Sequence, residues 1–426
     1  MRAGLDDPRQ FLQDLFRLAV TAADPQQALK RYLPRNTARR VRVIGAGKAA
    51  ASMASALEQH WAGEVSGLVV TPYSHALHCQ RIEVLEAAHP VPDAQGELAA
   101  QRMLALVSDL QADDLVICLL SGGGSALLSL PAPTITLAEK QTLSRQLLQC
   151  GATIGEINCV RKHLSAIKGG RLARACYPAQ LITYAISDVP GDQPDVIASG
   201  PTVADPTTSA QALAVLLRFD IPLAPHTVDW LQNPASETLK AGDAALVGSE
   251  FHLIATAQQS LESAARAARD AGLEVLLLGD SIEGEAREVA RVHAAMALSA
   301  RQQGEPASPP CLILSGGETT VTVNGQGRGG RNSEFLLSLA SALAGTPGIY
   351  ALAADTDGLD GSGNNAGAIL TPDSWQRARA LGLDAAAMLN DNDSYGFFAA
   401  LDDLIVTGPT RTNVNDFRAV LILPEP

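Results

Sequence analysis

Several features that would assign a chain of 426 residues to a class at once are missing from this sequence. Its six cysteines are scattered and form no Cys-x-x-Cys pair, which favours reduced thiols in a cytoplasmic protein over a disulfide framework or a zinc site. No stretch approaches the run of about 18 apolar residues that a membrane span needs, and no apolar secretory segment opens the chain. We therefore expect a cytoplasmic protein without a membrane partner.

Positive charge is also scarce. The net charge of −13 argues against nucleic acid as a partner of the whole molecule, although it is compatible with a local basic pocket for an anionic metabolite. The basic residues are mostly arginine, and lysine occurs only at positions 30, 48, 140, 162, 168 and 240. Lys48 stands out among them because it directly follows a glycine turn.

Common catalytic signatures are absent too. The sequence contains no G-x-x-x-x-G-K-[ST] loop, no G-x-S-x-G elbow, no H-E-x-x-H helix and no kinase-type H-R-D segment. These absences disfavour a hydrolase or a zinc protease. Any phosphate site must therefore be built from other turns.

Apolar strands and amphipathic helices alternate along the chain, which predicts an α/β fold. In the first half this pattern indicates a mostly parallel sheet covered on both faces. The predicted strands there are 41–45, 67–71, 82–86, 115–120 and 181–187, and the predicted helices are 48–60, 96–111 and 137–150. Prolines and threonines interrupt the pattern between about 201 and 245, and alternation resumes at 251. We therefore predict two domains, residues 1–240 and 241–426.

The first candidate site is the turn that contains Gly45, Gly47 and Lys48. It follows a strand and matches the G-x-G-x-x-A pattern that brings backbone amides to a phosphate. A dinucleotide site also needs an acidic residue at the end of the next strand, but Thr71-Pro72-Tyr73 stands there. A tight turn with glycines for packing is an equally simple explanation. Lys48 favours a site, because a lysine that opens a helix opposes the helix dipole unless it binds an anion.

The second candidate is a glycine run that follows another strand, Ser121-Gly122-Gly123-Gly124-Ser125. Consecutive glycines let several backbone amides point into one concavity, which is an anion-binding geometry. The alternative is a flexible turn, although glycine runs are entropically costly beside a buried strand. We therefore favour phosphate binding here.

Further candidates lie on polar loops after predicted strands, where ligands bind in open α/β sheets. Acids at these positions could hold Mg²⁺ or accept a hydroxyl proton, and an arginine could bind a phosphate or a carboxylate. Solvated turns explain each loop almost as well. The residues concerned are Asp188, Asp192, Glu318, Arg331, Asn332, Asp355 and Asp357.

Taken together and in this order, these segments resemble the glycerate 2-kinase family, also called the MOFRL family. The matching segments span residues 45 to 416, nearly the whole chain. They are GAGKAA (45–50), HPVPD (89–93), LSGGGSALL (120–128), RKHLSAIKGGRLA (161–173), SDVPGD (187–192), IASGPTVADPTT (197–208), LSGGETTV (314–321), GRGGRNSEF (327–335), ADTDGLDG (354–361) and GPTRTNVND (408–416).

The resemblance implies an N-terminal Rossmann-like domain with three α/β/α layers, a C-terminal α/β MOFRL domain, and an active site in the cleft between them. It also implies ATP-dependent phosphorylation of D-glycerate to 2-phosphoglycerate with Mg²⁺. The family's essential lysine falls on Lys48, its essential arginine on Arg331 and a site aspartate on Asp188, while its glycine loop falls on 122–125. Asp188 is the tentative Mg²⁺ ligand, and a homodimer stays open.

Two other functions remain in view. The first is a hydroxypyruvate reductase using NAD(P)H, a label that members of this family have carried; the missing ribose-binding acid argues against it. The second is a non-catalytic nucleotide or metabolite sensor, against which the lysine, arginine and acid set argues. An assay with D-glycerate, ATP and Mg²⁺, with NADH consumption followed in parallel, separates the three.

Overall fold

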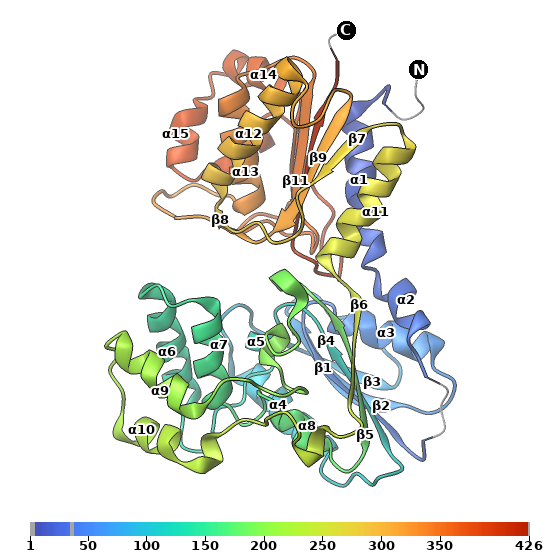
Figure 1. Cartoon of the computed structure of the whole chain (residues 1–426), viewed down its shortest axis with the longest axis vertical. Helices are drawn as coiled ribbons and strands as arrows, with labels where there is room; N and C mark the ends of the chain where they lie inside the picture. The colour runs from blue at the N-terminus through green and yellow to red at the C-terminus, as the bar shows by residue number, and fades with distance from the viewer. Residues whose placement is uncertain (1–4, 35–37, 425–426) are drawn as a thin grey trace. The chain divides into compact units, whose positions relative to one another are not determined.

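The computed structural model describes residues 5–34 and 38–424, which form two compact units (Figure 1). One unit is Pro25–Ile254, and the other combines Met1–Asp24 with Ala255–Pro426. We refer to them as unit A and unit B. These bounds do not coincide with 1–240 and 241–426. Helix α1 (Pro8–Ala22) packs on α11 (Ala257–Asp270) of unit B, while β6 (Glu250–Ala255) completes the sheet of unit A.

Unit A is built on a six-stranded sheet with the order β3-β2-β1-β4-β5-β6. The first five strands run parallel, as predicted. Their bounds are β1 (Val41–Ala46), β2 (Ser66–Pro72), β3 (Ile82–Ala87), β4 (Leu115–Leu120) and β5 (Gln180–Ile186). This order is that of a doubly wound, Rossmann-like sheet.

Helices cover both faces of this sheet. On one face, α4 (Ala94–Leu106) and α8 (Arg171–Cys176) share a core with inward residues of β1, β2 and β4. The buried alanines of α3 (Ala50–His60) lie outside that core, and α3 packs on β1, β2 and β4 from the other face. The three-layer α/β/α arrangement is thereby confirmed.

A separate helical group stands beside the sheet in unit A (Figure 1). It consists of α6 (Leu137–Gln149), α7 (Ile154–His163), α9 (Ser209–Arg218) and α10 (Pro225–Gln232), which share their own apolar core. The proline-rich stretch between about 201 and 245 thus lies inside this unit, near its C-terminal end at Ile254. Its prolines begin helices, as Pro225 does at the start of α10, because an N-terminal proline loses no helical hydrogen bond.

Unit B contains a second six-stranded sheet, with the order β13-β12-β11-β14-β9-β7. Only the β7–β9 pair is parallel, and the other pairs are antiparallel. The strands are β7 (Glu274–Leu277), β9 (Cys311–Gly317), β11 (Ile349–Asp355), β12 (Gly367–Leu370), β13 (Leu404–Ile405) and β14 (Asp416–Ile422). Because β9 and β14 are buried along their whole length, their apolar runs look like those of parallel strands.

Helices also cover both faces of the second sheet. Helices α12 (Ala286–Gln303) and α13 (Arg331–Leu343) pack on one face, and α1 with α11 packs on the other. Shorter elements complete the fold: α2 (Pro25–Ala28), α5 (Gly124–Leu127), α14 (Ser374–Ala380), α15 (Ala385–Asn390), α16 (Ser394–Ala400), β8 (Gly284–Glu285) and β10 (Thr319–Thr320).

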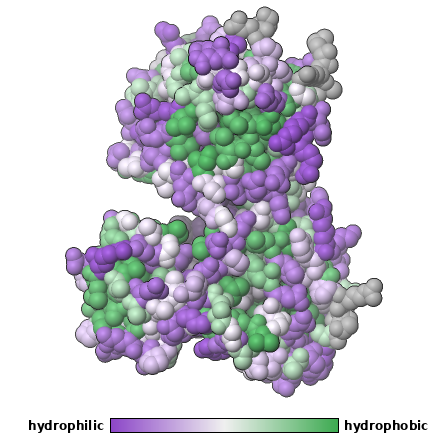
Figure 2. Space-filling view, in the orientation of Figure 1, coloured by the Kyte–Doolittle hydropathy of each residue, from purple (hydrophilic) through white to green (hydrophobic). Residues whose placement is uncertain are grey.

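The surface and the thiols agree with the composition. Within the described ranges no helix has the length and apolar character to cross a membrane. All six cysteines are free thiols, as expected. Figure 2 shows a mostly hydrophilic surface with apolar residues gathered over α12 and the neighbouring strands of unit B, where the edge-strand residues Val275, Leu276 and Leu277 are half-buried.

Candidate active site

The carboxyl edge of the unit A sheet gathers most of the predicted residues. From β1 the chain continues to β2 and β3 on one side, while β4 and β5 lie on the other side. The ends of β1 and β4 therefore form the topological switch point, where open α/β sheets bind their ligands. Lys48 follows β1 and Ser121 follows β4, so the two glycine turns meet at this point.

The Lys48 turn is tied directly to the glycine run. The Lys48 amide donates to the Gly122 carbonyl (2.8 Å), and the Ala49 amide donates to the Ser121 hydroxyl (2.9 Å). A Cβ atom on Gly47 would lie 2.1 Å from that same hydroxyl, so glycine is required there. Close packing against the residues that follow β4 thus explains why glycine is needed in this turn. The same packing places the half-buried Lys48 side chain beside the 121–125 turn.

Gly123 brings three predicted segments together. Its φ of 79° lies in the left-handed region. A Cβ atom placed on it would come within 3.1 Å of the His89 ring and 3.4 Å of Lys48 Cγ. The next residue, Gly124, begins the short helix α5, and its amide donates back to the Ser121 carbonyl (3.1 Å). That amide is used inside the turn, so the predicted anion nest has fewer donors than the three glycines suggest.

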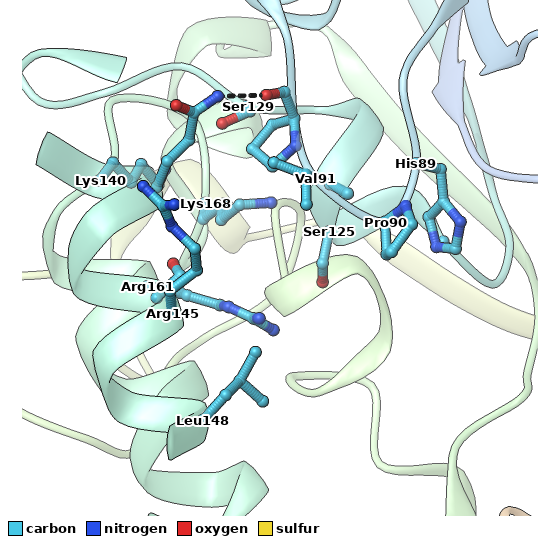
Figure 3. Close-up of a pocket in the computed structure, with 15 residues that line it drawn as sticks. His89, Pro90, Val91, Ser125, Ser129, Lys140, Arg145, Leu148, Arg161 and Lys168 are labelled. Atoms are coloured by element: carbon cyan, nitrogen blue, oxygen red, sulfur yellow. Dashed lines mark hydrogen bonds between the residues drawn. The ribbon is translucent and has the colours of Figure 1, made fainter. Parts of the chain in front are cut away.

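A cavity of about 200 Å³ opens beside Gly123 within unit A (Figure 3). Its walls come from the 89–92 segment, the 123–129 segment, helix α6, Arg161 on α7 and Lys168 just beyond α7. Four cationic residues line it: Lys140, Arg145, Arg161 and Lys168. No carboxylate is among the lining residues.

These cations are poorly compensated by the protein. Among the described atoms the ammonium of Lys140 is buried without a hydrogen-bond partner, and burial together with Arg161 and Arg171 lowers its pKa to about 7. Within the described residues, the hydrogen bond found for Lys168, 1% exposed, is a donation to the Ala198 carbonyl at 3.3 Å. Burial, with Lys140 and Arg161 nearby, holds the pKa of Lys168 well below its usual value. Since burial and mutual repulsion disfavour the charged forms of both lysines, an anion bound in the cavity would stabilise them as cations.

The loop with Asp188 and Asp192 follows β5 at the same edge of the sheet. Both side chains are half-buried, and the Ser187 hydroxyl fixes the turn by accepting the Val189 amide (3.2 Å). Neither acid lines the cavity. The structure thus brings Asp188 to the predicted edge of the sheet.

In unit B, Arg331 begins α13 and sits among carboxylates. Its guanidinium donates to Asp416 (2.8 Å), Glu318 (2.9 Å) and Asp355 (2.9 Å). These acids raise the pKa of Arg331 well above its usual value, against the opposing effect of burial. Arg418, fully buried, pairs with the other oxygen of Asp416. The charge on Arg331 is therefore balanced inside the protein.

The start of α13 is closed to anions by Asp360. This buried carboxylate accepts the amides of Asn332 (2.9 Å) and Ser333 (2.8 Å), and burial raises its pKa. Asn332 donates to Asp416 (2.7 Å) from a fully buried position. Asp357 accepts the Leu359 amide (2.8 Å) and shapes the same loop. The predicted residues of this unit thus form one connected network.

The described side chains offer few ligands for a divalent cation. Over residues 5–34 and 38–424 no group of three or more His, Cys, Asp or Glu side chains is arranged to hold a metal ion. Mg²⁺ in phosphoryl-transfer sites takes one or two carboxylates and completes its shell with water and substrate oxygens. A half-buried carboxylate such as Asp188 fits that requirement as a single ligand.

Sequence reasoning missed the cationic lining of the cavity. Lys140, Arg145, Arg161 and Lys168 come from separate helices and loops, so no short motif reveals them. Two signals were available: three of the six lysines, at 48, 140 and 168, border or line this region, and 161–173 was one of the matching segments. Asp416, which binds Arg331, was missed for the same reason, and so were Arg418 and Asp360 of the same network.

Comparison with known proteins agrees with this arrangement. Residues 11–232 match a family described as a domain of unknown function, DUF4147, and residues 311–416 match the MOFRL family. A provisionally named hydroxypyruvate reductase of Agrobacterium vitis is 54% identical over 97% of this chain and 94% of its own length.

Two further comparisons concern Thermotoga maritima. Its D-glycerate 2-kinase is 39% identical over 96% of this chain and 97% of its own length. The crystal structure of its glycerate kinase superposes with a TM-score of 0.89 and 38% identity, covering 98% of this chain and 100% of that one. The chain therefore belongs to the glycerate 2-kinase (MOFRL) family.

Proposed function

We propose that this protein is a glycerate 2-kinase that transfers the γ-phosphoryl group of ATP to the 2-hydroxyl of D-glycerate. One observation carries the proposal beyond family membership: Lys48 stands at the switch point of unit A, beside a cavity lined by cations without acids. Relatives named as glycerate kinases, 34% to 39% identical, support the same activity. The reaction class is phosphotransfer to an alcohol.

Phosphoryl transfer needs positioning and charge neutralisation more than covalent help from the protein. In this proposal Lys48 neutralises the moving phosphoryl group. Asp188 orients the glycerate hydroxyl or would hold Mg²⁺, which would supply positive charge to offset that of the phosphates. Arg331, the other predicted catalytic residue, belongs to unit B.

The balanced charge of Arg331 refines its predicted role. Three of its N–H groups already donate to carboxylates, and a guanidinium has five. The two N–H groups that remain could bind the glycerate carboxylate, while the surrounding acids hold the guanidinium in place. We therefore propose that Arg331 orients the substrate and does not act as a bare cation towards ATP.

The competing activity is hydroxypyruvate reduction, the name given to the Agrobacterium vitis relative. A nicotinamide cofactor at the Gly45–Gly47 turn would need an acid at the end of β2 for its ribose. That strand ends with Thr71 and Pro72, and Thr71 is fully buried. The turn is also closely packed against β4. Both observations favour the kinase.

The decisive experiment is product identification with purified full-length protein. D-Glycerate, ATP and Mg²⁺ should yield ADP and 2-phosphoglycerate, identified by the phosphorus NMR shift or by an isomer-specific coupled enzyme. The same preparation with hydroxypyruvate should leave NADH and NADPH unconsumed. NADH oxidation without ADP formation would reverse the assignment, and ATP binding without turnover on any hydroxy acid would indicate a sensor.

Other expectations stay predictions. These are Mg²⁺ as the metal, a cytoplasmic location and a homodimer. The half-buried apolar residues of β7 offer a surface on which to look for self-association. Equilibrium sedimentation of the purified chain measures its oligomeric state directly.

A further inference from the structure

We propose that the cavity lined by Lys140, Arg145, Arg161 and Lys168 in unit A is the binding site for the polyphosphate chain of ATP. This inference rests on the proposed kinase activity and specifies where that activity holds its phosphate donor. It assigns a task to four residues that lie outside the glycine turns and outside the Arg331 network.

The first argument is charge. Four cationic residues converge on one cavity, and no acid lines it. Buried cations ordinarily have paired acids, because an isolated buried charge is costly. In unit A the comparable buried lysine, Lys162, follows that rule: it binds Asp195 (3.0 Å) and Asp205 (2.9 Å). In the described part of the chain neither Lys140 nor Lys168 forms such an ion pair, so a ligand is the best source of their counter-charge.

The second argument is the match to the ligand. A triphosphate carries three to four negative charges in a linear array, whereas glycerate carries one. A single carboxylate would leave most of the cationic set uncompensated. The cavity volume of about 200 Å³ also exceeds the need of a three-carbon acid. Four cations spread over Lys140, Arg145, Arg161 and Lys168 fit the longer polyanion.

The third argument is continuity with Lys48. Gly123 lines the cavity, and the Lys48 side chain passes beside the same glycine, 3.4 Å from where its Cβ would be. Ser125, also in the lining, bonds to Ser199 (2.9 Å) and so fixes the loop whose Ala198 carbonyl accepts from Lys168. A polyphosphate in the cavity would thus present one end towards Lys48.

The side chains that line the cavity are arranged for direct contact with a bound polyphosphate. Figure 3 shows Lys168, Arg145, Arg161 and Ser125 around a common open space, with His89 and Pro90 at its side. Helix α6 supplies Lys140 and Arg145, and it is held against the 89–92 segment by a bond from Gln141 to the Pro92 carbonyl (2.6 Å). The site is therefore built before a nucleotide arrives.

The test measures nucleotide affinity in the full-length protein without glycerate. ATP, ADP, AMP, inorganic tripolyphosphate and D-glycerate are titrated by calorimetry or against a fluorescent ATP analogue. Tripolyphosphate should displace ATP, and D-glycerate should not. Lys168→Met and Arg161→Met should weaken ATP binding about 10- to 100-fold, because each removes a charge-assisted contact. The KM for glycerate should stay unchanged.

Two further variants serve as a control and as a second test. Lys30→Met removes an exposed lysine of the same unit and should leave affinity unchanged. Arg145→Met alters an exposed position of α6. It should also weaken ATP binding, and it provides this measurement if a buried substitution prevents folding. Lys168→Met should also raise the melting temperature, which loss of a merely structural lysine would not do.

The outcomes separate the inference from the activity. Unchanged ATP affinity in the cavity variants, or a rise in the KM for glycerate instead, would overturn the site while the kinase stands. A wild-type protein that makes no phosphoglycerate would defeat the proposed function. Loss of tripolyphosphate binding in Lys168→Met and Arg161→Met would still support a polyphosphate site in that case.

Discussion

The two units treat buried charge in opposite ways. In unit B, Arg331 and Arg418 are enclosed by Asp416, Asp355 and Glu318, and the pKa of Arg331 is raised well above its usual value. In unit A, Lys168 lies among other cations, and its pKa is held well below its usual value. One set of charges is satisfied by the fold, and the other is left for a ligand.

The difference indicates two kinds of function. A satisfied network holds its members in fixed directions, so its contribution is geometry. An unsatisfied set stores unfavourable electrostatic energy in the folded protein, and a bound polyanion relieves it. Removing a member of a satisfied buried network is therefore destabilising, whereas removing a member of an unsatisfied set stabilises the protein and weakens the ligand. The predictions below test this contrast.

The largest effect is expected for Lys48→Ala. Lys48 belongs to neither set: it is half-buried beside Gly123 and faces the proposed path of the phosphoryl group. Its loss should lower kcat about 10²- to 10³-fold, the typical cost of removing one group that stabilises transition-state charge. Steady-state phosphoglycerate formation measures this. The thermal midpoint should be unchanged, and near-normal turnover would remove Lys48 from the mechanism.

Arg331→Ala should be both inactive and unstable. The substitution leaves the carboxylate of Asp416, fully buried, and that of Asp355, 7% exposed, without their shared cation. Breaking a buried ion pair from one side costs about 3–5 kcal/mol. Denaturant unfolding checks this value, with Arg291→Ala as control, because the exposed Arg291–Glu288 pair should contribute less than about 1 kcal/mol. A stable Arg331→Ala would mean that the network is not satisfied in the way described.

Much of this contrast could not have been predicted from the sequence. Strand and helix alternation predicted the unit A sheet, and the turns after β1 and β4 located its switch point, because both signals are local. The charge balance around Arg331 depends on Asp416, 85 residues away, which sheet pairing places opposite Asp355 and which the packed helix α13 brings to Arg331. No local pattern specifies such a pairing.

The location of unit boundaries shows the same limit. The predicted first domain, 1–240, contains α9 and α10, which pack with α6 and α7 in unit A, but unit A begins at Pro25 and ends at Ile254. Helix α1 packs on α11, more than 230 residues later, through side chains such as Leu12 and Phe16. Membership in a core is decided by apolar faces that meet only in the folded chain, so sequence distance is a poor guide to it.

Lys140→Met should shift stability in the other direction from Arg331→Ala. It replaces a buried, unpartnered ammonium by an apolar side chain of similar length. Such replacements are neutral or stabilising by about 1–4 kcal/mol. Thermal unfolding of the ligand-free protein should therefore give a higher midpoint, while ATP protects the variant less than the wild type. A destabilised Lys140→Met would show that the ammonium has a structural partner.

The smallest expected effect is the pH dependence that Lys140 gives to folding stability and to ATP binding. Its pKa is about 7 in the folded protein and near 10.5 when unfolded, because burial and the cations Arg161 and Arg171 oppose its charge more than Glu97 favours it. Between these two pKa values the unfolded chain holds a proton that the folded chain lacks. Lys140 therefore makes the free energy of unfolding rise with pH between about 7 and 10.5, and it has no effect on stability below pH 7.

A polyanion favours the charged amine of Lys140. ATP binding above pH 7 should therefore take up a fraction of a proton, and the affinity for ATP should fall as pH rises. Calorimetry in two buffers of different ionisation enthalpy measures the uptake. Subtracting the value for Lys140→Met removes the titration of the nucleotide itself, and an equal uptake in both proteins would exclude Lys140 as its source.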